Sequence, residues 1–231
     1  MYEGIEYDYQ ETLGNFMYKV YGWMSGALAI TAVIAYYIST QPAIYEPLFN
    51  NLAYLIGLFI LQLGLVLALS IFLHKMTLPV AFAAFVLYAV SVGITLSVVF
   101  LNYTEASIYA TFLVTAGMFG TMCLYGYYTQ TDLTSLGNLM LMALFGLILG
   151  MFVNMFLKNE MFDFVLSAIG VVVFTLLTAY DAQKIKQMGR RLIADQQMMS
   201  KVAILGALTL YLDFINLFLY LLRFMGKRRE N

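Results

Sequence analysis

The chain has 231 residues, of which 62% are hydrophobic and 11% charged, with a mean hydropathy of +0.83 and a formal net charge of −1. A soluble domain carries about 25% charged residues, so this composition excludes a soluble globular protein and indicates a polytopic membrane protein. The few cations form only short clusters, which excludes a groove for nucleic acid. The single cysteine, Cys123, and single histidine, His74, exclude an internal disulfide and a structural His/Cys zinc site.

The chain begins with an acidic, polar segment, and we expect residues 1–19 to form a short cytoplasmic tail. A secretory signal peptide begins with cations and continues with an apolar run, so this segment is not one. Its carboxylates are Glu3, Glu6, Asp8 and Glu11.

Seven apolar segments follow, each close to the length of about 20 residues that crosses the hydrocarbon layer. We therefore expect an all-α, seven-transmembrane-helix bundle over residues 20–226, followed by a basic tail over residues 227–231. The apolar runs are too long, and lack the alternation, for strands of a membrane barrel. Short breaks predict that successive helices are antiparallel neighbours. The predicted spans are 20–39, 52–73, 79–101, 107–128, 136–157, 161–181 and 202–224.

Lysine and arginine in the connections indicate the orientation, because cytoplasmic loops are enriched in them. The connection before the last span carries Lys184, Lys186, Arg190, Arg191 and Lys201. With this connection in the cytoplasm, the N-terminus is also cytoplasmic. The basic C-terminal tail then lies outside if the last span crosses fully, which its length favours, and inside if that span enters and returns. The short connections suggest a bacterial plasma (inner) membrane, and an organelle membrane stays open.

The last predicted span contains LYLDFINLFLYLLR, residues 210–223, with an aspartate near its middle. A charged Asp at the centre of a membrane helix costs about 2.5–3.5 kcal/mol, so it normally faces the bundle interior or a watery cavity. Residues three and four positions apart lie on the same face of a helix, and those that share a face with this aspartate form one polar face in an otherwise apolar segment. This face predicts a helix at the centre of the bundle or lining a pore, and it comprises Gly206, Thr209, Asp213, Asn216, Tyr220 and Arg223.

The second carboxyl group is Asp181, one turn after Thr178 at the cytoplasmic end of the sixth predicted span. Alone, Asp181 can be an interfacial acid paired with Lys184 or Lys186, and Asp213 can be a neutral structural group. If they meet, both cannot ionise cheaply; the pair shares one proton near neutral pH, and its loss turns attraction into repulsion. Two carboxylates would also form a weak oxygen site for Ca²⁺, suited to conduction.

The predicted spans place the two acids at different depths. Asp213 lies roughly 17 Å along its helix from Val202, at 1.5 Å per residue, whereas Asp181 closes the span before it. They meet only if the sixth helix ends deep in the membrane or if the seventh begins well inside the cytosol, near Asp195.

YDAQKI, residues 180–185, and LYLDFINLFLYLLR resemble signature stretches of the Bax inhibitor-1 family, and its bacterial branch in particular. The resemblance covers residues 20–226. It implies seven helices with the last one central, and a pH-sensitive Ca²⁺ leak governed by an aspartyl pair that maps to Asp181 and Asp213. For some bacterial relatives it also implies a membrane AAA protease as partner.

One feature of this chain departs from that family pattern. In the family, an arginine of the second helix can latch one aspartate, whereas the second span here has Gln62 and no cation. We expect Lys75 to replace it; the neighbouring His74 is more simply an interfacial residue.

These patterns predict a pH-sensitive Ca²⁺-permeable leak channel gated by Asp181 and Asp213, without a cofactor. The alternative is a non-conducting regulator that binds and modulates a membrane AAA protease through the acidic tail. We expect no enzyme: a diaspartyl intramembrane protease needs a GxGD sequence that is absent around Asp213, and a serine protease needs a better placed histidine. The oligomeric state and the direction of flux stay open. The expected gate partners are Lys75, His74, Asn216, Thr209 and Thr178.

Overall fold

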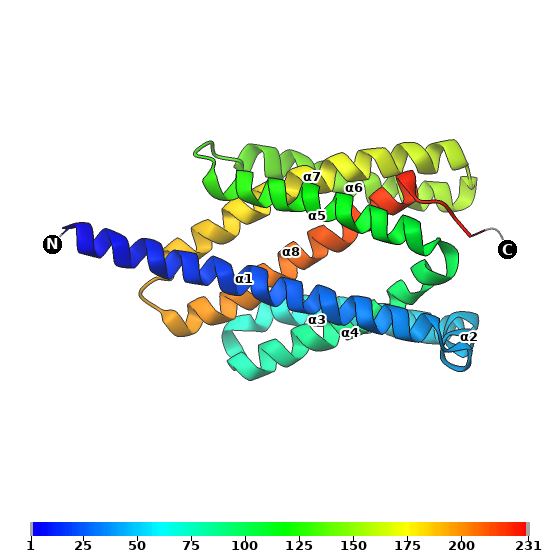
Figure 1. Cartoon of the computed structure of the whole chain (residues 1–231), viewed down its shortest axis with the longest axis horizontal. Helices are drawn as coiled ribbons and strands as arrows, with labels where there is room; N and C mark the ends of the chain where they lie inside the picture. The colour runs from blue at the N-terminus through cyan, green and yellow to red at the C-terminus, as the bar shows by residue number, and fades with distance from the viewer. Residues whose placement is uncertain (1, 230–231) are drawn as a thin grey trace. The chain divides into compact units, whose positions relative to one another are not determined.

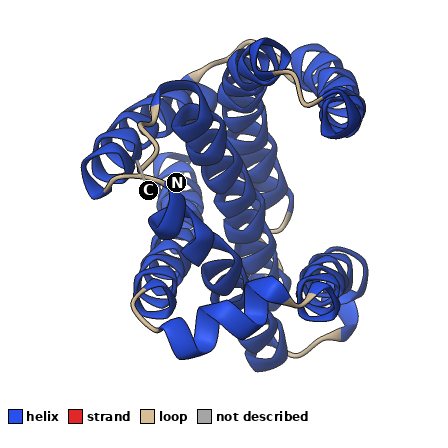
Figure 2. Ribbon diagram, turned by 90° about the vertical axis from the view of Figure 1, so that its right-hand side faces the viewer, coloured by secondary structure: helices blue, strands red, loops and turns tan. Residues whose placement is uncertain are grey.

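A computed structural model describes the backbone of residues 2–229 and the side chains of residues 10–229. Helices make up nearly all of this part of the chain (Figures 1 and 2), and no strand occurs in it beyond an isolated bridge between Tyr103 and Arg228. The predicted all-α fold class is confirmed. The elements are α1 (Tyr2–Ser39), α2 (Pro42–Asn50), α3 (Leu52–Phe72), the 3₁₀ turn η1 (Leu73–Lys75), α4 (Leu78–Asn102), α5 (Glu105–Tyr128), α6 (Thr134–Leu157), α7 (Glu160–Arg191) and α8 (Gln196–Met225).

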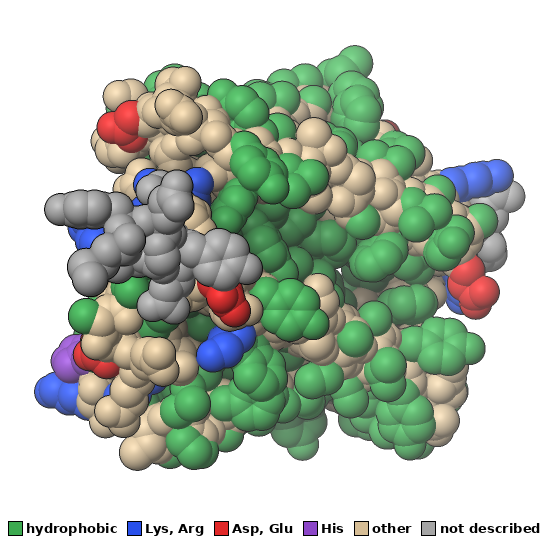
Figure 3. Space-filling model, turned by 60° about the vertical axis from the view of Figure 1, so that its left-hand side comes forward, with side chains coloured by type: hydrophobic (Ala, Val, Ile, Leu, Met, Phe, Trp, Pro, Cys, Tyr) green, Lys and Arg blue, Asp and Glu red, His purple; other side chains and the backbone are tan. Residues whose placement is uncertain are grey.

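Seven of the described helices, all except α2, are long and apolar enough to cross a membrane, as the sequence predicts. Large apolar side chains point outward from them: Phe59 is 64% exposed, and Phe145 and Phe156 are each 70% exposed. Figure 3 shows a face of the molecule that hydrophobic side chains largely cover, with few charges among them. Such a surface suits contact with lipid tails rather than water.

One connection and the N-terminal segment differ from the prediction. Residues 42–50 form α2 where an irregular break was expected, and Pro42 stands in the first turn, where its missing N–H costs little. The first helix extends back to Tyr2 through the segment expected to be a tail. The cytoplasmic placement of that segment stays a prediction.

The sixth and seventh spans also have boundaries that differ from the predicted ones. These boundaries decide whether Asp181 and Asp213 can lie at the same depth. The expected ends were 181 and 202, but α7 continues to Arg191 and α8 begins at Gln196. The carboxylate of Asp195 accepts the N–H of Met198 at 2.9 Å and so caps the new helix. The intervening polar residues are mostly good helix formers, so they extend the two helices rather than form a loop.

Asp181 and Asp213 can lie at the same depth if the last helix begins near Asp195, and α8 does begin there, at Gln196. α8 also runs unbroken for 30 residues, about 45 Å at 1.5 Å per residue, which contradicts the alternative of a helix that enters and returns. Of the seven spans, α8 buries the largest share of its most apolar stretch, 67%, against 6% for α3 and α6. A central helix requires such burial, although the central position itself stays a prediction.

The chain divides into two compact units, which we call unit 1 (Met1–Asn102 with Gln187–Tyr211) and unit 2 (Tyr103–Lys186 with Leu212–Asn231). In unit 1, α4 packs against α1 and α3. The fully buried Tyr211 of α8 joins this packing: its hydroxyl donates to Thr31 at 2.6 Å, because the Thr31 hydroxyl itself donates to the carbonyl of Ala89 at 2.9 Å. A polar chain across three helices is thus fully paired inside unit 1.

In unit 2, α7 contacts α5, α6 and α8. Gly126 of α5 lies against the backbone of α7: a Cβ there would stand 2.1 Å from the carbonyl oxygen of Ala179. On the side of α8, the ring of Tyr220 stacks on Phe174 with centroids 5.6 Å apart. The close α5–α7 contact lies two residues before Asp181, so it helps to fix the depth of that acid.

Gly126→Ala should lower the stability of the protein by about 1–3 kcal/mol, because the added methyl group overlaps backbone atoms that cannot move aside. The measurement is the apparent melting temperature of the purified protein in detergent. Gly120→Ala on the same helix is the matched control, since a Cβ there meets nothing within 4 Å. Its melting temperature should be unchanged or slightly higher, through better helix propensity; equal losses in both variants would contradict the packing argument.

Candidate functional site

Asp181 of α7 and Asp213 of α8 lie together in unit 2, and their carboxyl groups are hydrogen-bonded to each other. Asp213 is buried, with 5% of its surface exposed, and Asp181 is half-buried. A residue from each of the last two membrane helices thus contributes to one acidic site.

A hydrogen bond between two carboxyl groups contains a proton, because an ionised carboxylate can only accept. The contact therefore requires at least one of the two carboxyl groups to be protonated. With both groups ionised, the same contact would hold two negative charges side by side in an apolar surrounding. The geometry of the pair thus depends on its protonation.

One oxygen of the pair receives no N–H or alcohol hydroxyl donor. Oδ2 of Asp213 is buried and accepts no hydrogen bond from such a group among the described residues, which is uncommon in a folded protein. It is an acceptor that a proton or a cation can use. The described residues contain no group of three or more His, Cys, Asp or Glu side chains that could hold a metal ion, and Ca²⁺ takes six to eight oxygen ligands. The pair alone therefore suits transient contact with Ca²⁺ rather than tight binding.

Gln183, two residues after Asp181, joins the second half of α7 to the connection between α5 and α6. Its amide oxygen accepts the N–H of Leu133 at 2.9 Å, and its amide nitrogen donates to the carbonyl of Thr131 at 2.8 Å. Sequence reasoning missed this residue. Its place within YDAQKI was the available clue, but the backbone groups it reaches lie some 50 residues earlier in the chain.

An aromatic contact positions the other acid. Phe214, the residue after Asp213, packs edge-on against Phe112 and Phe119 of α5, with centroid distances of 5.7 and 5.3 Å. Because α5 also contacts α7 at Ala179, the same helix supports both members of the pair.

The polar residues expected to accompany the acids donate to their own helices. Thr178 donates to the carbonyl of Phe174 at 2.7 Å, Thr209 to that of Leu205 at 3.1 Å, and Asn216 to that of Leu212 at 2.8 Å. These bonds satisfy polar groups within an apolar helix. The part of these three residues as gate partners stays a prediction.

The cation that acts on Asp181 is Lys184, one turn later on α7. Its ammonium group lies over the ring of Tyr180, 5.5 Å from the centroid. Lys186 donates to the carbonyl of Tyr127 and lies over the ring of that residue. Lys184, one of the two lysines considered for Asp181, is thus an electrostatic partner of that acid.

The expected latch residues lie on η1. Lys75 and His74 are both exposed, and the Lys75 ammonium group lies 5.9 Å from the centroid of the Phe72 ring. They belong to unit 1, whereas Asp181 belongs to unit 2. The predicted interaction of Lys75 with Asp181 therefore stays a prediction.

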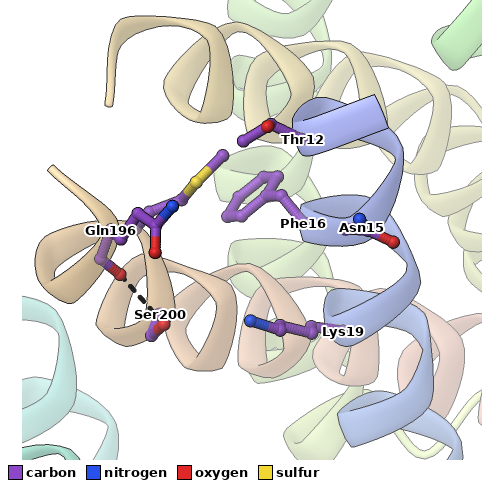
Figure 4. A pocket seen from close by; sticks show the side chains of 7 residues that line it. Thr12, Asn15, Phe16, Lys19, Gln196 and Ser200 are labelled. Carbon is purple, nitrogen blue, oxygen red and sulfur yellow. Dashed lines mark hydrogen bonds between the residues drawn. The ribbon is translucent and has the colours of Figure 1, made fainter. Parts of the chain in front are cut away.

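A separate polar cavity of about 170 Å³ lies in unit 1, between α1 and the first turns of α8 (Figure 4). The described residues that line it include one cation and no carboxylate, so they offer neither the shared proton nor the oxygen ligands of the acid pair. The lining residues are Thr12, Asn15, Phe16, Lys19, Gln196, Met199 and Ser200.

Comparison with known proteins gives a consistent result along nearly the whole chain. The model of a family described as "Inhibitor of apoptosis-promoting Bax1" matches residues 13–230. Inner membrane protein YbhL of Escherichia coli (strain K12) is 51% identical over 218 residues, which are 94% of this chain and 93% of that protein. A protein of Borreliella burgdorferi is 46% identical over 94% of both chains, and one of Rickettsia prowazekii is 43% identical over 96% of this chain and 93% of its own.

Gln183→Met should loosen the connection between α5 and α6, because it keeps the size of the side chain but removes both hydrogen bonds. The amide of Leu133 should then exchange its hydrogen at least about fivefold faster, as expected for the loss of a bond worth about 1–3 kcal/mol. Hydrogen exchange with mass spectrometry measures this. Gln187→Met is the control, since Gln187 makes no such bond in the described part of the chain; the same acceleration in this variant would refute the role of Gln183.

Proposed function

The chain belongs to the Bax inhibitor-1 family, and we propose that it acts as a pH-sensitive Ca²⁺-permeable leak channel gated by the carboxyl pair of Asp181 and Asp213. It is an integral protein of the bacterial inner membrane: seven of its described helices can span a bilayer, and the relative with 51% identity is an inner membrane protein. The observation that carries the proposal is the contact of two acids from neighbouring membrane helices.

The gate in this proposal is the protonation of the pair. With one shared proton, the hydrogen bond holds α7 and α8 together at the level of the two acids. When pH rises and the proton leaves, two negative charges face each other in an apolar surrounding, and the contact becomes repulsive. A change in the spacing of two helices is then a change of state that pH controls.

The proposed permeant ion follows from the chemistry of the oxygens. Ca²⁺ prefers carboxylate and carbonyl oxygens, and the buried Oδ2 of Asp213 receives no N–H or alcohol hydroxyl donor from the described residues. Conduction requires binding strong enough for entry and weak enough for exit. Two carboxylates without a third acidic ligand in the described part of the chain meet that requirement better than a full coordination cage.

Ca²⁺ flux into liposomes that contain the purified protein, measured between about pH 6 and about pH 8, tests the proposal. The wild-type flux should depend on pH through the shared proton. Asp213→Asn and Asp181→Asn each replace one acid with an amide that donates to the remaining carboxylate at every pH. Both variants should therefore have, at high pH, the flux that the wild type has at low pH. For each variant, the ratio of the flux at high pH to the flux at low pH should be about one.

Glu46→Gln, which removes an exposed carboxylate of α2, is the control and should leave the pH dependence intact. A pH dependence that survives in both aspartate variants would reject the pair as the gate. Absence of protein-dependent flux at every pH would overturn the channel itself. It would leave the non-conducting regulator of a membrane AAA protease, whose expected acidic handle, apart from Glu11, lies outside the described side chains: Glu3, Glu6 and Asp8.

Lys75→Ala tests the proposed latch in the same assay. Removing a cation that acts on Asp181 makes the shared proton harder to lose, so the midpoint of the flux–pH curve should move to higher pH. Lys184→Ala is the reference variant, because the charge of Lys184 acts on Asp181 in the structure, and it should shift the midpoint in that direction. A shift with Lys184→Ala and none with Lys75→Ala would exclude Lys75 as the latch.

A further inference from the structure

A cavity of about 460 Å³ lies in unit 2, where the turn between α6 and α7 meets the end of α8. In Figure 1 this turn and the C-terminal segment of the chain lie at the same end of unit 2. Three cations line the cavity: Lys158 ends α6, Arg223 stands in the last turn of α8, and Arg228 follows that helix. Positive charge thus converges on the cavity from three places in the sequence.

The three cations form no ion pair with a described side chain. The ion pair found in this part of the chain joins Arg229, which does not line the cavity, to Glu105 at 3.6 Å. Glu160 and Asp163 also line the cavity, but both lie in the first turn of α7, where the helix amides stabilise negative charge. Among the described residues that line the cavity, three cations face two carboxylates, which leaves a net positive charge. This balance favours an anionic ligand.

The segment that carries Arg228 is held in place by its backbone. The N–H of Thr104 donates to the carbonyl of Lys227 at 3.2 Å, and the N–H of Lys227 donates to the hydroxyl of Ser107 at 2.9 Å. Arg228 itself bridges to Tyr103. A positioned arginine loses less conformational entropy on binding than one on a mobile tail.

Gly226 permits this arrangement. Its N–H donates to the carbonyl of Leu222 at 2.8 Å, and a Cβ at this position would lie 2.3 Å from that same oxygen and 3.0 Å from the ring of Tyr103. Only a residue without a side chain lets the chain turn so closely against α8 and the start of α5. The cavity is therefore built by the fold rather than left by a loose end.

The cavity lies at the ends of three membrane spans: α6 ends at Leu157, α7 begins at Glu160 and α8 ends at Met225. The headgroups of membrane lipids begin where such apolar spans end. One wall of the cavity is apolar, since Phe164 lines it and stacks on Phe224 with ring centroids 4.9 Å apart. A ligand at this level therefore meets cations on one side and an aromatic wall on the other.

We propose that this cavity binds the phosphate group of an anionic membrane phospholipid, with Arg223 and Arg228 as its principal contacts and Lys158 as a further charge. The guanidinium group presents paired N–H donors that match two phosphate oxygens. The volume leaves room for the rest of the headgroup beside the phosphate. This site lies at the opposite end of α7 from Asp181, and it does not depend on Ca²⁺ conduction.

Binding is tested with the full-length protein in a neutral detergent, by native mass spectrometry and by the apparent melting temperature. The probes are phosphatidylglycerol, phosphatidylcholine and sodium phosphate. The wild type should bind phosphatidylglycerol and melt at a higher temperature with it. Arg228→Gln and Arg223→Gln should each lower the affinity for this lipid about tenfold, as expected for the loss of a charge-assisted hydrogen bond.

Arg229→Gln is the matched control: it removes the same charge one residue later, from a side chain outside the cavity, and should leave the affinity unchanged. The melting temperatures without lipid show that each variant is folded. Equal affinity of the wild type, Arg228→Gln and Arg223→Gln would overturn the site. Equal binding of phosphatidylcholine would overturn the preference for an anionic lipid, and the same stabilisation by sodium phosphate at the same concentration would show a site for the free ion instead.

Discussion

The hydrogen bond between the carboxyl groups of Asp181 and Asp213, inside an apolar helix bundle, is the contact around which the packing of α7 and α8 in unit 2 is arranged. Asp213 is buried on a membrane helix, and a lone charge there costs a few kcal/mol. The hydrogen bond to Asp181 lowers that cost as long as the pair holds one proton. In the proposed gate, the pair is stable with a shared proton and repulsive without it, which is a property that a fully paired structural group does not have.

Asp181 and Asp213 bond to each other, whereas the other polar side chains near them bond to backbone groups. Thr178, Thr209 and Asn216 satisfy their donors on their own helices, and Gln183 uses both ends of its amide on the preceding connection. α5 supports both acids, through its close approach to Ala179 and through the packing of Phe214. Within unit 2, therefore, a change in protonation acts on a contact between otherwise well-paired helices.

The two ends of α7 carry different chemistry. Glu160 and Asp181 are 21 residues apart on one continuous helix, about 32 Å at 1.5 Å per residue. One end contributes to a negative, proton-dependent pair, and the other borders a positively charged cavity at the level where lipid headgroups begin. If the proposed lipid site holds the start of α7 at the headgroup level, Asp181 acquires a defined depth further along the same helix, which a proton-dependent contact with α8 requires.

The sequence by itself determined the class of the protein, the number of membrane helices and the two acids of interest. These properties follow from apolar runs long enough to cross a bilayer, and from aspartates whose presence in such runs needs a special reason. The predicted end of α7 and start of α8 were wrong. The residues between the predicted ends are polar, which suggests a loop beside a membrane span, but most of them are good helix formers and extend the two helices. The contact of Asp181 with Asp213, the clamp formed by Gln183 and the cavity around Arg228 were decided only by the tertiary structure. Each brings together residues that lie far apart in the chain, and local patterns carry no information about which distant group a side chain will meet.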